Sequence, residues 1–150
     1  MSGFLSYMDM AINEARAAGA RGEVPVGAVL VRDGVVIARA GNRVRALSDP
    51  TAHAEMLVIR EACLAGRSER LAAGADLYVT LEPCPMCAAA ISAARVGRLY
   101  YGAADPKSGG VTVGARVFSH PQCHHVPEVY GGVGEAASEA LLKDFFAGRR

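Results

Sequence analysis

The chain has 150 residues, of which 51% are hydrophobic and 21% charged, and this composition excludes a disordered or fibrous protein. Its 16 Lys and Arg nearly balance its 15 Asp and Glu, which excludes a strongly basic protein that coats nucleic acid. The length predicts one domain over residues 1–150 that needs no disulfides. The sequence contains no signal-peptide pattern and no apolar run near the roughly 18 residues of a membrane span, so we expect a cytoplasmic protein without a membrane partner.

The first third of the chain predicts a helix followed by a β-hairpin. Apolar residues recur at helical spacing before Gly19, at positions Phe4, Met8, Ile12 and Ala15. Two β-branched runs follow, over residues 26–32 and 35–40. Asp33 and Gly34 join them and favour a tight hairpin turn, because both residue types tolerate positive φ.

A polar loop over residues 42–50 leads into a second predicted helix. Thr51 is expected to cap this helix, which starts near His53. One face of the helix carries apolar side chains, at positions Met56, Ile59 and Cys63. The loop therefore leads to a helix N-terminus that begins with a histidine.

A strand–helix–strand unit is predicted next. Residues 76–81 and 98–103 are the strands, and residues 84–94 form the helix between them. Pro85 suits the first turn of this helix, and Gly97 lies beyond its end. The chain thus places two cysteines, like the histidine, at a helix start.

The last part predicts an edge strand and a closing helix. Pro127 lacks a backbone N–H, so a strand over residues 124–130 can lie only at the edge of a sheet. Residues 135–147 form a helix with two apolar pairs spaced four residues apart, Leu141 with Phe145 and Leu142 with Phe146. The alternation of strands and helices predicts an α/β fold.

The residue types at these two helix starts are those of a zinc site. Cys84 and Cys87 are spaced i and i+3 in a first helical turn, where the helix dipole and free N–H groups favour the thiolate forms that bind zinc. The imidazole of His53 makes three protein ligands, and three ligands leave the open position that is typical of catalytic zinc. Glu55, two residues from His53, is then free to transfer a proton.

Two other interpretations of these residues remain open. The two cysteines could belong to a structural zinc site, closed by another side chain from the set Cys63, Cys123, His120, His124 and His125. The chain could also be a non-catalytic RNA-binding module that keeps zinc for folding. Glu55 has no task in either case.

The sequence resembles the zinc-dependent nucleoside and nucleobase deaminases. Their pattern of His, any residue and Glu, then Pro, Cys, two residues and Cys, is matched by His53, Glu55, Pro83, Cys84 and Cys87. The chain is more similar still to the bacterial tRNA-specific adenosine deaminases, over nearly all of its length. This resemblance implies a three-layer α/β/α cytidine-deaminase-like fold with a central five-stranded mixed sheet, one Zn²⁺ per subunit, a homodimer, and the anticodon stem-loop of tRNA as partner.

The resemblance also implies a reaction. Adenosine at the wobble position (34) of the tRNA anticodon is hydrolysed to inosine, with zinc-activated water attacking C6 and Glu55 carrying the protons. The alternative is a zinc deaminase of a free base or nucleotide of the cytosine, guanine or cytidine type. Both remain possible from the motif, because the metal ligands do not select the base.

The substrate contacts are implied by the same resemblance. Asn42 hydrogen-bonds the flipped base, Val26 forms a wall of the pocket, and the Ala54 N–H positions the base or the developing oxyanion. The RNA contacts are assigned to a loop and to the last helix, at Asp105, Lys107, Phe145, Arg149 and Arg150.

Overall fold

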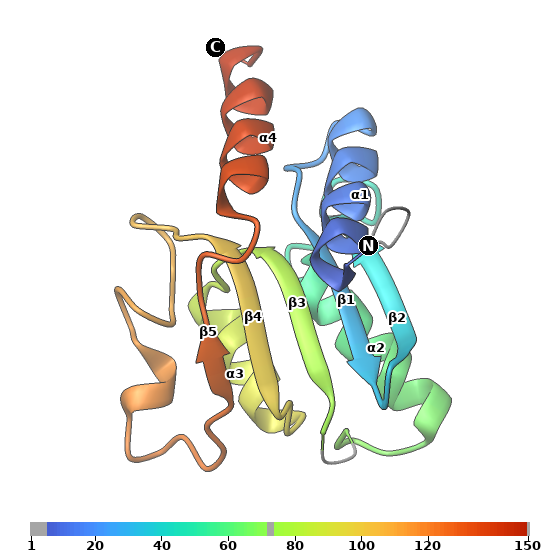
Figure 1. Cartoon of the computed structure of the whole chain (residues 1–150), viewed down its shortest axis with the longest axis vertical. Helices are drawn as coiled ribbons and strands as arrows, with labels where there is room; N and C mark the ends of the chain where they lie inside the picture. The colour runs from blue at the N-terminus through green and yellow to red at the C-terminus, as the bar shows by residue number, and fades with distance from the viewer. Residues whose placement is uncertain (1–5, 72–73, 150) are drawn as a thin grey trace.

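The computed structural model describes residues 6–71 and 74–149, and it consists of a central sheet between two layers of helices (Figure 1). The five strands lie in the order β2-β1-β3-β4-β5. β1 runs antiparallel to β2 and β3, whereas β3, β4 and β5 run parallel to one another. The strands are β1 Gly27–Arg32, β2 Val35–Gly41, β3 Asp76–Leu81, β4 Arg98–Ala103 and β5 Glu128–Tyr130. The predicted three-layer fold with a five-stranded mixed sheet is therefore confirmed.

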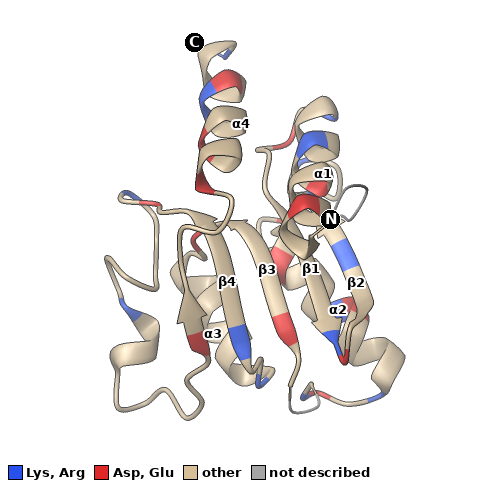
Figure 2. Ribbon diagram, in the orientation of Figure 1, with Lys and Arg blue, Asp and Glu red and all other residues tan. Residues whose placement is uncertain are grey.

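The helices are divided between the two faces of the sheet. They are α1 Tyr7–Ala20, α2 Ala54–Gly66, α3 Pro85–Ala93 and α4 Glu135–Ala147, with a short 3₁₀ helix η1 at Val117–Ser119. α1 and α4 lie on one face, and α2 and α3 lie on the other (Figure 1). Figure 2 shows acidic and basic residues interspersed along both α1 and α4.

Most of the buried apolar side chains lie between the sheet and the α2–α3 layer. Fully buried members come from strands and helices alike, at Leu30, Leu77, Leu99, Val58 and Ile91. A smaller cluster, at Met8, Ala11, Val29 and Val31, joins α1 to the opposite face. Burial of the larger cluster holds α2 and α3 on the sheet. The starts of these two helices are therefore fixed by the core.

α1 packs unusually close to the sheet. A Cβ added at Gly27 would clash with the carbonyl oxygen of Ala11, so only glycine allows the helix to touch β1 there. The helix begins with a capping box: Ser6 Oγ accepts from the Asp9 N–H at 3.1 Å, and the Asp9 carboxylate accepts from the Ser6 N–H at 3.3 Å. Phe4, predicted as part of this helix, lies outside the described residues.

The prediction that Thr51 caps the second helix is wrong. α2 begins at Ala54 with His53 as its N-cap, while the Thr51 hydroxyl donates to Asp49 at 2.7 Å. The buried face also differs from the predicted one. Its buried residues include Ala54, Val58 and Ala62, whereas Met56, Ile59 and Cys63 are only partly buried.

Two elements near the C-terminus differ from expectation. β5 covers only Glu128–Tyr130, so the predicted strand is too long at its N-terminal end. It pairs with β4 alone, at the edge, as Pro127 required. α4 has the predicted bounds, but Phe146 is 53% exposed, whereas Phe145 is partly buried.

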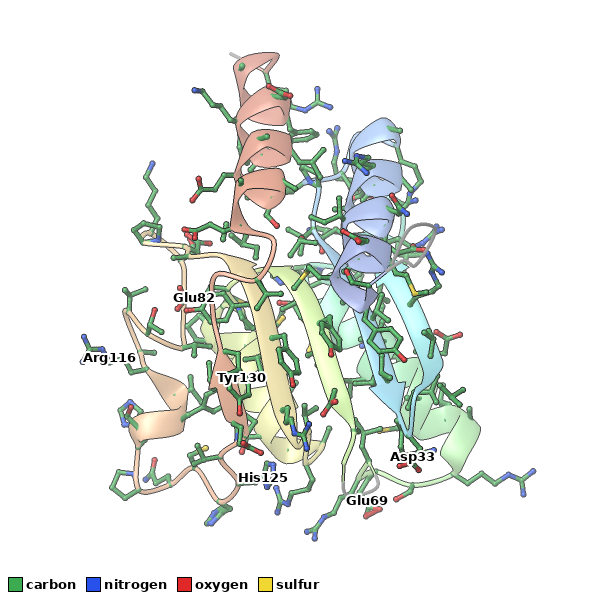
Figure 3. All side chains as sticks on the ribbon, viewed as in Figure 1. Asp33, Glu69, Glu82, Arg116, His125 and Tyr130 are labelled. Carbon is green, nitrogen blue, oxygen red and sulfur yellow. The ribbon has the colours of Figure 1, made fainter. Side chains whose placement is uncertain are left out.

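Four tyrosines form a row across the face that carries α1. The ring centroids are 5.4 Å apart between Tyr7 and Tyr78, 4.5 Å between Tyr78 and Tyr100, and 5.1 Å between Tyr100 and Tyr130. Tyr130, at the open end of the row, lies on β5 (Figure 3). The row therefore connects α1 to the edge strand through the middle of the sheet.

In the part of the chain that the structure describes, no helix has both the length and the apolar character needed to cross a bilayer.

Candidate metal centre and active site

Three side chains from two helix starts meet on the α2–α3 side of the sheet. His53 is the N-cap of α2 and Cys84 is the N-cap of α3, with Cys87 less than one turn further on. The Nδ1 atom of His53 lies 3.7 Å from Sγ of Cys84 and 3.4 Å from Sγ of Cys87. Neither N-cap side chain bonds its own helix, so both point to the shared site.

The spacing of these atoms fits a tetrahedral zinc ion. Nitrogen and sulfur ligands at the usual zinc bond lengths lie about 3.6 Å apart in a tetrahedron. The distances from His53 Nδ1 to the two sulfurs, 3.7 and 3.4 Å, lie on either side of this value. Two thiolates and one imidazole are also a ligand set that zinc prefers. These three residues could hold zinc and leave a fourth position for water or substrate.

The protonation of the two thiols is unequal. A hydrogen bond from Cys87, and another from His53, lower the pKa of Cys84 to about 4. The pKa of Cys87 is raised by its hydrogen bond with Cys84 and further by burial. The pKa of His53 is raised by its own hydrogen bond with Cys84. Because zinc binds thiolates, its binding displaces the proton held by Cys87.

Glu55 lies beside this cluster with an oxygen that lacks a partner. It is in the first turn of α2 and is 4% exposed, and its Oε1 has no hydrogen-bond partner. Burial raises the pKa of Glu55 to about 7. Buried polar atoms without partners are rare, so this oxygen marks a place for a polar ligand atom. A carboxyl group with this pKa can both take up and return a proton near neutral pH.

Asn42 links three segments at the edge of the site. Its Oδ1 accepts from the Ala54 N–H at 2.8 Å, and its Nδ2 donates to the Val24 carbonyl at 3.2 Å. The Ala54 N–H that the resemblance assigns to the substrate thus donates to Asn42 in this structure. Val26, the predicted pocket wall, is 5% exposed and packs in the same core as Ala54.

The loop after β4 carries the other predicted contacts with RNA. Asp105 Oδ1 accepts from the backbone N–H groups of Lys107, at 3.2 Å, and Ser108, at 3.0 Å. Lys107 is exposed. The same loop touches the metal centre, because the Gly110 N–H donates to the carbonyl of Pro83 at 2.8 Å. Asp105 and Lys107 therefore belong to a loop that is bonded to the turn before Cys84.

The predicted contacts in α4 lie on its last turn and just beyond it. Phe145 is edge-on to Phe146 with the centroids 5.3 Å apart, and the guanidinium of Arg149 lies 3.9 Å from the centre of the Phe145 ring. Arg149 therefore covers one face of the ring for which base stacking is predicted. Arg150 lies outside the described residues.

The residues considered as a fourth protein ligand have other surroundings. Cys123 Sγ lies 3.3 Å from Ser92 Oγ, and it donates to the His125 carbonyl at 3.2 Å. The imidazole nitrogens of His120 and His125 each lie 2.6 Å from a backbone carbonyl oxygen. Among the described residues, His53, Cys84 and Cys87 are the group with the geometry of a metal site. The structure favours the open site over the closed one.

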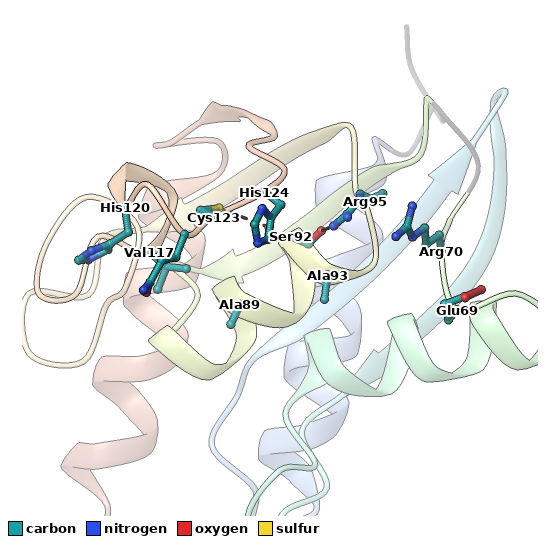
Figure 4. A pocket seen from close by; sticks show the side chains of 11 residues that line it. Glu69, Arg70, Ala89, Ser92, Ala93, Arg95, Val117, His120, Cys123 and His124 are labelled. Atoms are coloured by element: carbon teal, nitrogen blue, oxygen red, sulfur yellow. Dashed lines mark hydrogen bonds between the residues drawn. The ribbon is translucent and has the colours of Figure 1, made fainter.

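A separate cavity of about 670 Å³ borders the outer face of α3. Ala89 and Ala93 of the helix line one side, and Cys123 and His124 of the loop before β5 line the other (Figure 4). Its lining includes none of the three candidate metal ligands or Glu55. This cavity is therefore distinct from the metal centre.

Sequence reasoning missed two buried glutamates that border the site. Glu23 and Glu82 are each 2% exposed and accept several backbone hydrogen bonds. The available signal was the position of Glu82 directly before Pro83 and Cys84, because a charged residue there interrupts an otherwise apolar approach to the ligand turn.

Comparison with known proteins places the chain among deaminases. The family model for the cytidine and deoxycytidylate deaminase zinc-binding region matches residues 2–103. A tRNA-specific adenosine deaminase from Agrobacterium fabrum is 63% identical over 144 residues, which cover 96% of this chain and 94% of the relative. The corresponding protein of Bacillus subtilis is 49% identical, with 93% and 86% covered.

A solved structure gives the same result at the level of the fold. It comes from a study of A-to-I editing by tRNA:A34 deaminases at the wobble position of transfer RNA. The two structures have a TM-score of 0.88 and 65% sequence identity, with 91% of this chain and 98% of the other covered.

Zinc content is expected to depend on the three clustered ligands and not on the other cysteines. His53→Ala and Cys84→Ala should lose the metal, whereas Cys63→Ala and Cys123→Ala should retain it, because neither of the latter thiols lies in the cluster. Metal analysis by mass spectrometry after dialysis measures this. Loss of zinc from the Cys63 or Cys123 variant would instead identify a fourth protein ligand.

Proposed function

This chain belongs to the tRNA-specific adenosine deaminases, within the larger family of zinc-binding cytidine and deoxycytidylate deaminases, and we propose that it converts adenosine to inosine at wobble position 34 of a tRNA anticodon. The observation that carries the proposal is the buried Glu55 carboxyl, with one oxygen unpartnered beside His53, Cys84 and Cys87. A structural zinc site has no use for such a group. A hydrolytic site requires one.

The reaction is adenosine plus water to inosine plus ammonia. His53, Cys84 and Cys87 would hold the zinc ion, which would supply the acidity that lets a water molecule lose a proton near neutral pH. Glu55 accepts that proton and delivers it to N1 of the adenine ring as C6 is attacked. It then takes up the remaining proton of the oxygen now bonded to C6 and transfers this proton to the departing amino group, so that inosine and ammonia are the products. A pKa near 7 suits a group that must accept and donate in turn.

The base pocket lies between Asn42 and the start of α2 in this proposal. The Asn42 Nδ2 atom carries a second hydrogen besides the one given to Val24, and this hydrogen is offered to an acceptor on the everted base. The Ala54 N–H orients the Asn42 carboxamide and through it the base. Val26 forms an apolar wall.

The anticodon loop is held by contacts outside the pocket. Lys107 offers a charge to phosphate, and Asp105 fixes the turn that carries it. Phe145 offers an aromatic face for stacking, and Arg149 offers a second positive charge. These contacts supply binding energy that a free nucleoside cannot obtain.

We further propose a cytoplasmic homodimer with one zinc ion per subunit. The cytoplasmic location is supported by the relatives, which are named tRNA-specific adenosine deaminases. The dimer is supported by the outer face of α3, where the small side chains of Ala89 and Ala93 allow another element to pack closely.

Glu55→Gln tests the proton transfer. The variant should keep its zinc and its fold, because the substitution removes no metal ligand. Its kcat should fall by about 10²- to 10⁴-fold, because a carboxamide cannot carry the proton. Ammonia release and metal content are measured on the same samples. A Glu55→Gln protein with normal turnover would rule out the proposed role.

Substrate choice distinguishes RNA editing from deamination of a free base. An anticodon hairpin with adenosine at position 34 should gain about 1 Da on incubation, since an amino group is replaced by oxygen. Free adenosine should be a very poor substrate, because it lacks the loop contacts. Efficient turnover of free guanine, cytosine or cytidine, with none of the hairpin, would contradict the RNA assignment and leave the zinc chemistry in place.

The oligomeric state is checked by sedimentation equilibrium at micromolar concentration. A homodimer has a mass of about 31 kDa, twice the 15.6 kDa of the chain. Replacement of Ala93 by arginine should shift the equilibrium to monomer, because a long charged side chain cannot be accommodated at a close helix contact. A wild-type protein that sediments as a monomer while fully active on the hairpin would contradict the dimer.

A further inference from the structure

Two buried glutamates outside the reaction each bind a loop that borders the metal centre. Glu23 follows α1 and Glu82 follows β3, and each is 2% exposed. Neither takes part in an ion pair among the described residues, so their charges are balanced chiefly by hydrogen bonds. An isolated buried carboxylate is costly unless it is fully hydrogen-bonded, which makes the choice of glutamate at both positions informative.

Glu23 binds the loop between β2 and α2. Its Oε1 accepts from the N–H of Arg45 at 3.0 Å, and its Oε2 accepts from the N–H of Ala46 at 2.8 Å. This loop starts at Asn42 and ends at His53. Glu23 therefore holds the segment that joins the base-contacting residue to the first metal ligand.

Glu82 binds the loop after β4 in the same way. Its Oε1 accepts from the N–H of Asp105 at 3.1 Å, and its Oε2 accepts from the N–H of Thr112 at 2.8 Å. Oε2 also accepts from the Val111 N–H, at 3.2 Å, and from the Thr112 hydroxyl, at 3.1 Å. Glu82 lies near the carboxyl ends of β3 and β4, on the side of the loop that leads to Arg116 (Figure 3).

The loop after β4 is fitted closely around this carboxylate. A Cβ at Gly109 would lie 2.8 Å from Oε2 of Glu82, and a Cβ at Gly110 would lie 2.5 Å from the backbone nitrogen of Pro85. The two glycines allow the loop to contact the carboxylate on one side and the Cys84 turn on the other. The position of Asp105 and Lys107 relative to the metal centre is thus set through Glu82.

We infer that Glu23 and Glu82 are positioning residues, which hold the loops over residues 42–53 and 104–112 on either side of the metal centre in the arrangement that the RNA substrate requires. This inference rests on the proposed deamination of tRNA. Each carboxylate fixes two or more N–H groups of a loop that lacks regular secondary structure. The loops carry the residues assigned to the base and the anticodon. Because the carboxylates already order these loops in the free protein, RNA binding loses less conformational entropy.

The test uses Glu23→Gln and Glu82→Gln, with Glu14→Gln as the matched control. A glutamine turns an NH₂ group toward an N–H donor, so at least one loop bond is lost at each position. The Glu14 side chain accepts a hydrogen bond from Arg39, at 2.7 Å, which joins α1 to β2 and involves neither loop. Steady-state kinetics on the anticodon hairpin, zinc content and hydrogen exchange of the loop amides are measured for all three.

We expect KM for the hairpin to rise about tenfold in both variants, with kcat within about twofold and zinc content unchanged. Amide exchange should accelerate at Arg45 and Ala46 in Glu23→Gln, and at Asp105, Val111 and Thr112 in Glu82→Gln. The control should match the wild type. Thr112→Val, which removes only one bond to Glu82, gives a milder variant should Glu82→Gln fail to fold, and its KM should rise about threefold.

An unchanged KM despite faster loop exchange would overturn the inference. A fall in kcat together with zinc content would also overturn it, since that result describes a purely structural role. Amide exchange needs no substrate, so it measures loop anchoring even if the wild-type protein does not act on the hairpin. Should a free base prove to be the substrate, the same comparison of KM with kcat on that base decides whether the carboxylates position the loops for it.

Discussion

The contact between the starts of α2 and α3 determines the rest of the site. Each helix is held on the sheet by the large apolar cluster, and each begins with a candidate metal ligand whose side chain leaves its own helix uncapped. Both helices therefore lack a side-chain N-cap, which would stabilise each of them by about 1 kcal/mol, at the positions where the candidate ligands converge. A bound metal ion would offset this lost stability, because it binds only the folded protein, in which the ligands are already assembled.

Three buried glutamates near the candidate metal centre have pKa values that are shifted in opposite directions. Burial alone would raise the pKa of all three. In Glu23 and Glu82 the backbone hydrogen bonds outweigh burial and lower the pKa, so these two groups stay charged. Glu55 has an unpartnered oxygen, and burial raises its pKa to about 7. The number of N–H donors around each carboxyl thus separates the groups that hold loops from the group that can move a proton.

The sequence predicted features that depend on local spacing and missed those that depend on distant contacts. The ligand positions follow from helix starts, so the cluster could be predicted and is found. The cap of α2 was misplaced because Asp49, two residues away, takes the Thr51 hydroxyl. β5 is short because only Glu128, Val129 and Tyr130 pair with β4, and this pairing is a contact between distant parts of the chain. The bond from the Thr112 N–H to Glu82 joins residues 30 apart, and no local pattern indicates such a contact.

The row of tyrosines provides this protein with an optical reporter of its own. The sequence contains five tyrosines and no tryptophan, and four of the five tyrosines belong to the row. Rings held at 4.5 to 5.4 Å in a fixed geometry exchange excitation energy and give a strong near-ultraviolet circular dichroism signal, which disappears when side-chain packing is lost. The row joins α1 to the edge strand on the face opposite the metal centre. Its spectrum therefore follows the folding of the scaffold independently of the chemistry at the candidate metal centre.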